Sequence, residues 1–163
     1  MTDSLIECLV PFVGDKKEVK IADIGSGPLP RIGRYLEGVK VEVYSSDKQN
    51  FTGIKYQDME KLTYSDNSFD IVYCSNALDH TKDALSAVKE MIRVCKVGGI
   101  VYIECWLDQL STGYKHYWDA KEDGLFVNRI GGKFDLKDFG FQIKFIDRPG
   151  ERRYKRIIAT LQK

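Results

Sequence analysis

Cysteine and histidine are scarce in this sequence. Its 163 residues include four cysteines and two histidines, and no two cysteines form a C-x-x-C pair. Cys74, Cys95 and Cys105 lie within apolar runs, so we expect buried thiols in a reducing cytosol rather than disulfides. Because no closely spaced cluster of histidine, cysteine and aspartate is present either, the sequence predicts no metal site.

Long apolar runs and an excess of charge of one sign are also absent. No run approaches the roughly 18 residues needed to cross a bilayer, and no signal-peptide pattern opens the chain. The formal net charge is +1 at pH 7, so no strong field attracts nucleic acid or a membrane surface. We therefore expect a cytoplasmic protein whose partner is neither a membrane nor a nucleic acid.

What the sequence does contain is one globular domain over residues 1–163, since 43% of its residues are hydrophobic and 12% aromatic. Strand-like runs alternate with helical segments, which predicts an α/β fold with a doubly wound, mostly parallel sheet. The seven expected strands cover 20–24, 39–45, 54–57, 69–75, 100–106, 141–147 and 153–162. The last two form an antiparallel hairpin with a turn at Pro149-Gly150.

Helical spacing predicts a helix over 82–95 that ends at Gly98-Gly99, and shorter helices over 4–13 and 30–36. One helical turn is expected over 136–139. The segment from 107 to 134 is aromatic but irregular in pattern, so we expect no regular element there.

The run Asp23-Ile24-Gly25-Ser26-Gly27-Pro28 stands at the end of the first strand. Glycines allow a ligand to approach the backbone closely, and a following helix would offer unpaired N–H groups to a polar ligand. Asp23 is suited to the ammonium group of a bound amino acid. Asp47 and Asp58 end the next two strands, where carboxylates accept the hydroxyls of a ribose and the amine of an adenine.

Two other nucleotide sites fit this run less well. A dinucleotide site requires G-x-G-x-x-G, but Pro30 occupies the place of the third glycine. Asp23 would also repel a pyrophosphate. A P-loop is excluded, because no Gly-Lys-Ser/Thr follows the glycines.

Several stretches together resemble the class I S-adenosylmethionine (SAM)-dependent methyltransferases, specifically the type 11 methyltransferase-domain family. The resemblance covers roughly residues 20–106 and is carried by the runs 21–28, 43–47, 57–62, 66–80 and 87–99. It implies SAM as the cofactor. The residues that it assigns to SAM are Asp23, Gly25, Ser26, Gly27, Asp47, Asp58, Met59, Ser75 and Asn76.

Methyl transfer needs an aligned nucleophile, and a general base helps when the nucleophile carries a proton. His80 follows Asn76 at the mouth of the expected site and is our candidate catalytic base; the alternative is a surface or helix-capping histidine. His116, Tyr117 and Trp118 are candidates for the substrate pocket, against the alternative of a packed aromatic patch.

A basic run around the last hairpin, Arg148, Arg152, Arg153, Lys155 and Arg156, indicates a solvated face or a contact with an anionic substrate or RNA. The sequence favours a SAM-dependent methyltransferase that acts on a small molecule. Two alternatives stay open. One is a methyltransferase of protein or RNA, and the other is an accessory module that binds SAM without catalysis.

Overall fold

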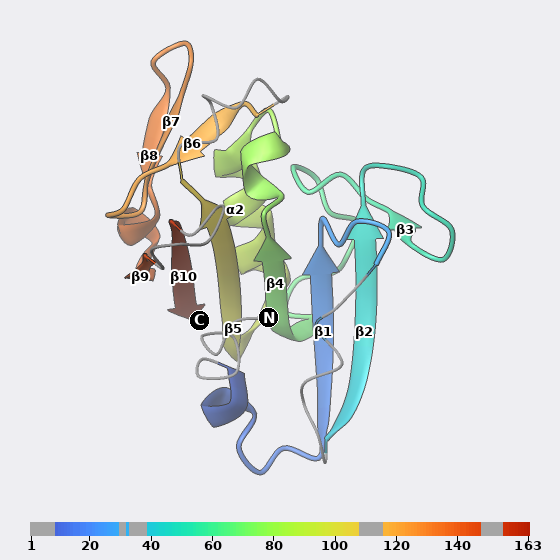
Figure 1. Ribbon diagram of the computed structural model, residues 1–163. Coiled ribbons are helices and arrows are strands. Elements are labelled where there is room, and N and C mark those ends of the chain that lie inside the picture. Colours follow the sequence, from blue (N-terminus) through green and yellow to red (C-terminus); the bar gives the residue numbers. More distant parts are fainter. Residues whose placement is uncertain (1–8, 30–31, 33–38, 108–115, 148–154) are drawn as a thin grey trace.

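The computed structural model describes residues 9–29, 32, 39–107, 116–147 and 155–163, and its centre is a seven-stranded sheet (Figure 1). The strand order is β3-β2-β1-β4-β5-β10-β9. The strands are β1 (Glu18–Ile24), β2 (Lys40–Asp47), β3 (Lys55–Tyr56), β4 (Phe69–Ser75), β5 (Cys95–Trp106), β9 (Gln142–Ile146) and β10 (Arg156–Gln162). Only β10 is reversed in this sheet, since it pairs antiparallel with both β5 and β9. The predicted seven-stranded, mostly parallel sheet with a reversed last strand is confirmed.

Side chains alternate along each strand, so both faces of the sheet present apolar residues, and these pack against helical segments. On one face Ala22 and Ile24 of β1 pack in a buried cluster with the apolar side of helix α2 (Ala84–Val94). On the other face Val19 and Ile21 pack with residues of a short helix over 9–13. The rest of the predicted helix over 4–13 lies outside the described residues, as does most of the predicted helix over 30–36.

Helix α2 begins after Asp83, whose carboxylate accepts a hydrogen bond from the Ser86 N–H. The helix ends at Val94, so the prediction that Gly98-Gly99 terminates it is wrong. The physical reason is that Cys95 is already extended, with φ −69° and ψ 135°, and pairs with Phe69 of β4. The glycines lie inside β5 instead, which starts five residues earlier than the predicted strand over 100–106.

The segment expected to be irregular contains a second sheet, which corrects the prediction for 107–134. Strands β6 (Trp118–Ala120), β7 (Leu125–Asn128) and β8 (Lys133–Asp135) pair antiparallel. They are too short to show a reliable alternation in sequence. Contacts between aromatic rings hold them together: the Phe134 centroid lies 5.3 Å from that of Trp118 and 5.1 Å from that of Phe126.

After β8, a 3-10 helix, η4 (Leu136–Phe139), confirms the predicted helical turn and leads into β9. The turn at Pro149-Gly150 and the basic residues Arg148, Arg152 and Arg153 lie outside the described residues. Arg156, however, is not on a solvated face. It is 6% exposed, and its guanidinium lies 2.7 Å from the Glu104 carboxylate. A buried acid on β5 therefore neutralises the last residue of the basic run.

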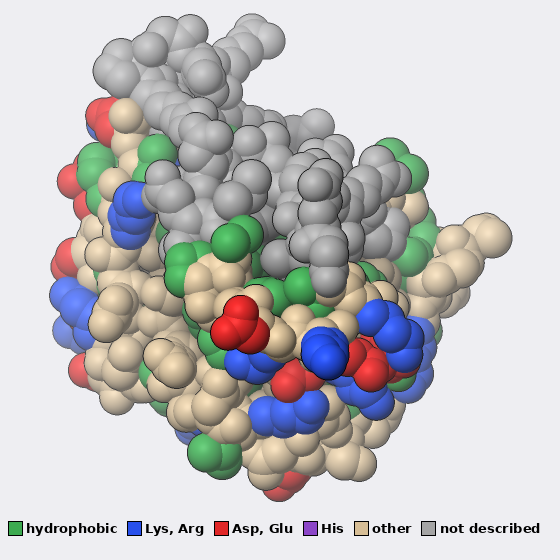
Figure 2. All heavy atoms as spheres, turned by 90° about the horizontal axis from the view of Figure 1, so that it is seen from below, with side chains coloured by type: hydrophobic (Ala, Val, Ile, Leu, Met, Phe, Trp, Pro, Cys, Tyr) green, Lys and Arg blue, Asp and Glu red, His purple; other side chains and the backbone are tan. Residues whose placement is uncertain are grey.

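Charges of both signs are interspersed on the face seen from below in Figure 2. Ion pairs contribute to this mixture: the Lys40 amine lies 2.8 Å from Glu18 and 3.6 Å from Glu42. The described part of this face therefore carries no patch of a single sign, and the net charge of the whole sequence is +1. No helix among the described residues is long and apolar enough to cross a membrane.

Candidate active site

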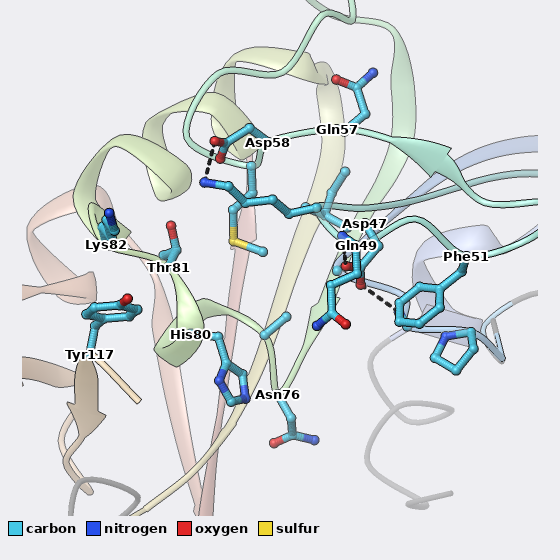
Figure 3. A pocket seen from close by; sticks show the side chains of 17 residues that line it. Asp47, Gln49, Phe51, Gln57, Asp58, Asn76, His80, Thr81, Lys82 and Tyr117 are labelled. Carbon is cyan, nitrogen blue, oxygen red and sulfur yellow. Dashed lines mark hydrogen bonds and ion pairs between the residues drawn. The ribbon is translucent and has the colours of Figure 1, made fainter. Parts of the chain in front are cut away.

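A cavity of about 530 Å³ opens at the carboxyl ends of β1, β2 and β4 (Figure 3). This size suits a cofactor or another small molecule. Open α/β sheets bind ligands at this edge, beside the point where strand order reverses, which here is between β1 and β4. The cavity brings together eight residues that the sequence singled out. They are Gly25, Gly27, Asp47, Asp58, Met59, Asn76, His80 and Tyr117.

The glycine bend after β1 requires its glycines for two different reasons. Gly25 and Gly27 have φ values of +69° and +62°, which L side chains rarely adopt. A Cβ atom on Gly25 would also lie 2.4 Å from the Ala77 Cβ and 3.2 Å from the Met59 Cε. Backbone N–H groups of Gly25 and Ser26 bond to the Ser46 carbonyl, which ties the bend to β2. The bend is thus tied to β2 by hydrogen bonds and packs closely against Ala77 in the loop after β4.

Asp47 joins the glycine bend to the end of β2. Its Oδ2 atom accepts a hydrogen bond of 2.9 Å from the Gly27 N–H, and its Oδ1 atom accepts one of 2.8 Å from the Gln49 N–H. Each carboxylate oxygen keeps a further lone pair. The residue is thus oriented by the backbone and still able to accept hydrogen bonds from a ligand in the cavity.

Asp58 lies at the upper edge of the cavity in Figure 3, paired with Lys48. The Lys48 amine lies 2.6 Å from Asp58 Oδ2, and the Glu60 N–H donates to Oδ1 over 3.1 Å. Burial acts to raise the pKa of Asp58, but the Lys48 hydrogen bond and charge and the Glu60 N–H together lower it. Asp58 is therefore held as an anion that accepts hydrogen bonds.

Asn76 forms the floor of the cavity just beyond β4. It adopts φ +52°, a conformation uncommon for a residue other than glycine. Hydrogen bonds compensate this cost: its N–H donates to the Glu104 carbonyl, its side-chain oxygen accepts from the Trp106 N–H, and its amide group donates to Ser75 Oγ. The loop between β4 and α2 consequently leaves the sheet in one defined direction.

Asp23 lies behind the bend and does not line the cavity. Its side chain is on the opposite face of β1 from Ile24, and the residue is 3% exposed. Burial, with a smaller contribution from the charge of Asp47, raises the pKa of Asp23 to about 7. At neutral pH this carboxyl group is thus divided between its neutral and charged forms.

The 3-10 helix η2 (Leu78–His80) presents His80 to the cavity. Beneath it, His116 Nδ1 lies 2.5 Å from the Asp79 Oδ2 atom. The ring centroids of His80 and His116 are 4.3 Å apart. The Tyr117 N–H donates to the Asp79 carbonyl, and the Trp118 indole donates to the Lys82 carbonyl. The strand β6 and the residues before it are thereby fastened to η2.

The remaining candidates support the cavity without lining it. Ser26 donates its hydroxyl to the Gly27 carbonyl, and Ser75 lies at the end of β4. Trp118 is 7% exposed and belongs to the core cluster beneath α2, while His116 is half-buried under His80. Tyr117 is the one member of the predicted aromatic substrate pocket that lines the cavity.

Sequence reasoning missed most of the wall that follows Asp47. Lys48, Gln49 and Phe51 line the cavity, although they lie in a loop without helical or strand periodicity. The available signal was a single aromatic residue close to the end of a strand. Thr81 and Lys82 complete the opposite wall, where the Glu60 carboxylate accepts hydrogen bonds from both.

Comparisons with known proteins agree with this geometry. Residues 36–103 match the methyltransferase domain family. The chain is 35% identical over 139 residues to a ubiquinone/menaquinone biosynthesis C-methyltransferase of Coxiella burnetii, across 84% of this chain and 51% of that protein. It is 30% identical over 112 residues to a sterol 24-C-methyltransferase of Aspergillus fumigatus, across 58% and 30%. The chain thus spans about half or less of the length of these curated relatives.

Solved structures share the fold at low sequence identity. A SAM-dependent methyltransferase from Aquifex aeolicus is 16% identical, with a TM-score of 0.59 over 96% of this chain and 87% of that one. A Burkholderia thailandensis 1,6-didemethyltoxoflavin-N1-methyltransferase is 14% identical, with a TM-score of 0.62 over 99% and 77%. With its strand order, its glycine bend and these matches, the chain has the fold of the class I SAM-dependent methyltransferases, and its residues 36–103 match the methyltransferase-domain family.

Proposed function

We propose that this protein transfers the methyl group of SAM to a small-molecule acceptor. One observation carries the proposal: the Gly25–Gly27 bend and the Asp47 and Asp58 carboxylates converge on a single cavity at the carboxyl edge of the sheet. The arrangement offers glycine backbone at the bend and acids at the next two strand ends. This order matches an amino acid, a ribose and an adenine joined in that sequence, as they are in SAM.

In this proposal the bend receives the methionine part, with Ser26 as part of the bend and Asp23 behind it. Asp47 accepts the ribose hydroxyls, and Asp58 accepts the adenine amine. The Met59 side chain, which lies against the bend, flanks the adenine ring. Ser75 and Asn76 form the floor beside the sulfur.

The reaction needs the acceptor to attack the methyl carbon in line with the breaking sulfur–carbon bond. The electron pair of that bond stays on sulfur and leaves S-adenosylhomocysteine. Positioning in a site closed to water supplies much of the rate. His80 and Tyr117 line the cavity beside the Asn76 floor and are assigned to the acceptor side. The His80 imidazole is suited to take the proton of an acceptor hydroxyl or amine.

The choice of a small-molecule acceptor is supported by the relatives. Their names refer to ubiquinone/menaquinone biosynthesis, to a sterol and to 1,6-didemethyltoxoflavin. A single domain over residues 1–163 and a cytoplasmic location remain predictions of the sequence.

Transfer of a labelled methyl group from SAM to fractionated cell extract tests this function. We expect label in the small-molecule fraction, and a loss of at least about tenfold with Asp47→Ala, since removal of a charged hydrogen-bonding partner costs about 1.5–3 kcal/mol. Glu42→Gln, also on β2 but far from the cavity lining, is the matched control and should keep full activity. Label in protein or RNA alone would contradict the small-molecule proposal, and no transfer with any fraction would contradict catalysis.

A further inference from the structure

Asp79, His80 and His116 form a cluster beside the residues that we assign to SAM. Each residue offers one donor atom, and the three atoms lie within 4.8 Å of one another. Asp79 Oδ2 is 2.5 Å from His116 Nδ1 and 4.0 Å from His80 Nε2. This group is not evident in the sequence, because 35 residues separate the two histidines along the chain.

The second observation concerns the other oxygen of the same carboxylate. The Asp79 side chain is 6% exposed, yet its Oδ1 atom has no hydrogen-bond partner among the described residues. An unpartnered oxygen on a buried carboxylate costs free energy unless a proton donor or a cation meets it. The polar contacts that fasten η2 to β6 fix this carboxylate in place without satisfying that oxygen.

We propose that Asp79, His80 and His116 bind a divalent transition-metal ion such as Zn²⁺ at the acceptor end of the cavity. Two imidazoles and one carboxylate are a ligand set that suits zinc and its neighbours in the first transition row. Bonds of about 2.0–2.1 Å in a tetrahedral site place ligand atoms roughly 3.3 Å apart. The two distances measured from Asp79 Oδ2 need to change by less than about 1 Å to reach this value.

Both Asp79 and His116 must present a lone pair to the ion, so the ion replaces the hydrogen bond between them. Three protein ligands leave one position open, and His80 lies on the cavity wall, so that position is directed to the acceptor. This part of the inference rests on the proposed function. An acceptor oxygen bound to the ion loses its proton to water and then attacks the methyl carbon. His80 acts as a ligand in that case, and not as the base.

Co²⁺ titration of tag-free, metal-stripped protein, followed by its visible absorption and by equilibrium dialysis, tests the site. We expect one bound ion per chain. His80→Asn, at a side chain that is 49% exposed and therefore safe for folding, should weaken binding by more than the roughly 10–100-fold typical of losing an outer-shell partner. Asp138→Asn, at an exposed acid on η4, is the control and should bind like the wild type.

His116→Gln provides a second removal of a ligand, with circular dichroism to verify its fold. The proposal is overturned if the wild type binds no Co²⁺, or if His80→Asn binds it as tightly as the wild type. Calorimetry with S-adenosylhomocysteine in the presence of a chelator separates the two proposals. Cofactor binding without metal binding refutes only the metal site, and metal binding without cofactor binding refutes only the proposed methyl transfer.

Discussion

Replacing Asp23 with asparagine should remove a pH-dependent loss of stability. The carboxyl group is 3% exposed, and burial together with the charge of Asp47 raises its pKa from 3.8 to about 7. Between these two values the folded protein binds more protons than the unfolded chain. The group therefore favours folding below about pH 4, and this contribution is lost as the pH rises through about 7.

The size of the effect follows from the same shift. A difference of one pKa unit corresponds to about 1.4 kcal/mol, so the folding free energy changes by roughly that amount for each pH unit inside the window. Between pH 5 and pH 8 only the part of the window from 5 to about 7 is crossed. We expect the Asp23→Asn variant to gain about 3 kcal/mol relative to the wild type over that range.

Urea denaturation of both proteins at several pH values measures this difference, because titrations of all other groups cancel between them. Asp138→Asn serves as the surface control, and the difference in unfolding free energy between this variant and the wild type should be independent of pH. A stability difference between Asp23→Asn and the wild type that stays constant from pH 5 to pH 8 would refute the reasoning. It would mean that the Asp23 carboxylate is stabilised in the folded protein by groups that offset its burial.

Three further outcomes are expected. Gly25→Ala should cost roughly 1–3 kcal/mol in urea denaturation and weaken binding of S-adenosylhomocysteine, whereas Gly131→Ala, with a similarly positive φ but open space around it, should leave binding intact. Arg93→Met should lower stability by roughly 1–3 kcal/mol, because the guanidinium donates hydrogen bonds to the Leu62 and Tyr64 carbonyls. Cofactor binding should not change, since these contacts lie outside the cavity lining. An unchanged urea midpoint would contradict this role. Lys48→Met should raise the pKa of Asp58 in an NMR titration, because it removes the hydrogen bond that lowers it; an unshifted titration would contradict that assignment.

The central sheet could be predicted because each of its strands carries a local signal. β4 has the predicted bounds, Phe69–Ser75, since a turn precedes a mostly apolar run there. The glycine bend and Asp47 were predicted for a similar reason, as they directly follow strands. The boundary between α2 and β5 was not, because the partner strand β4, rather than Gly98-Gly99, determines where the helix ends.

Other features depend on contacts between distant parts of the chain. The sheet β6-β7-β8 is held by aromatic packing of Trp118, Phe126 and Phe134, which alternation over three or four residues does not reveal. The contact of His116 with Asp79 exists because this sheet docks on η2. In the same way, the burial of Arg156 depends on Glu104 of β5, which is 52 residues away in the sequence.

Titration calorimetry with S-adenosylhomocysteine tests most directly whether the cavity beside the glycine bend is a SAM site. We expect binding of one molecule per chain for the wild type and for Glu42→Gln. We expect at least tenfold weaker binding for Asp47→Ala, because it loses a charged hydrogen-bonding partner. Absence of measurable binding to the wild type, or equal affinity in Asp47→Ala, would contradict it.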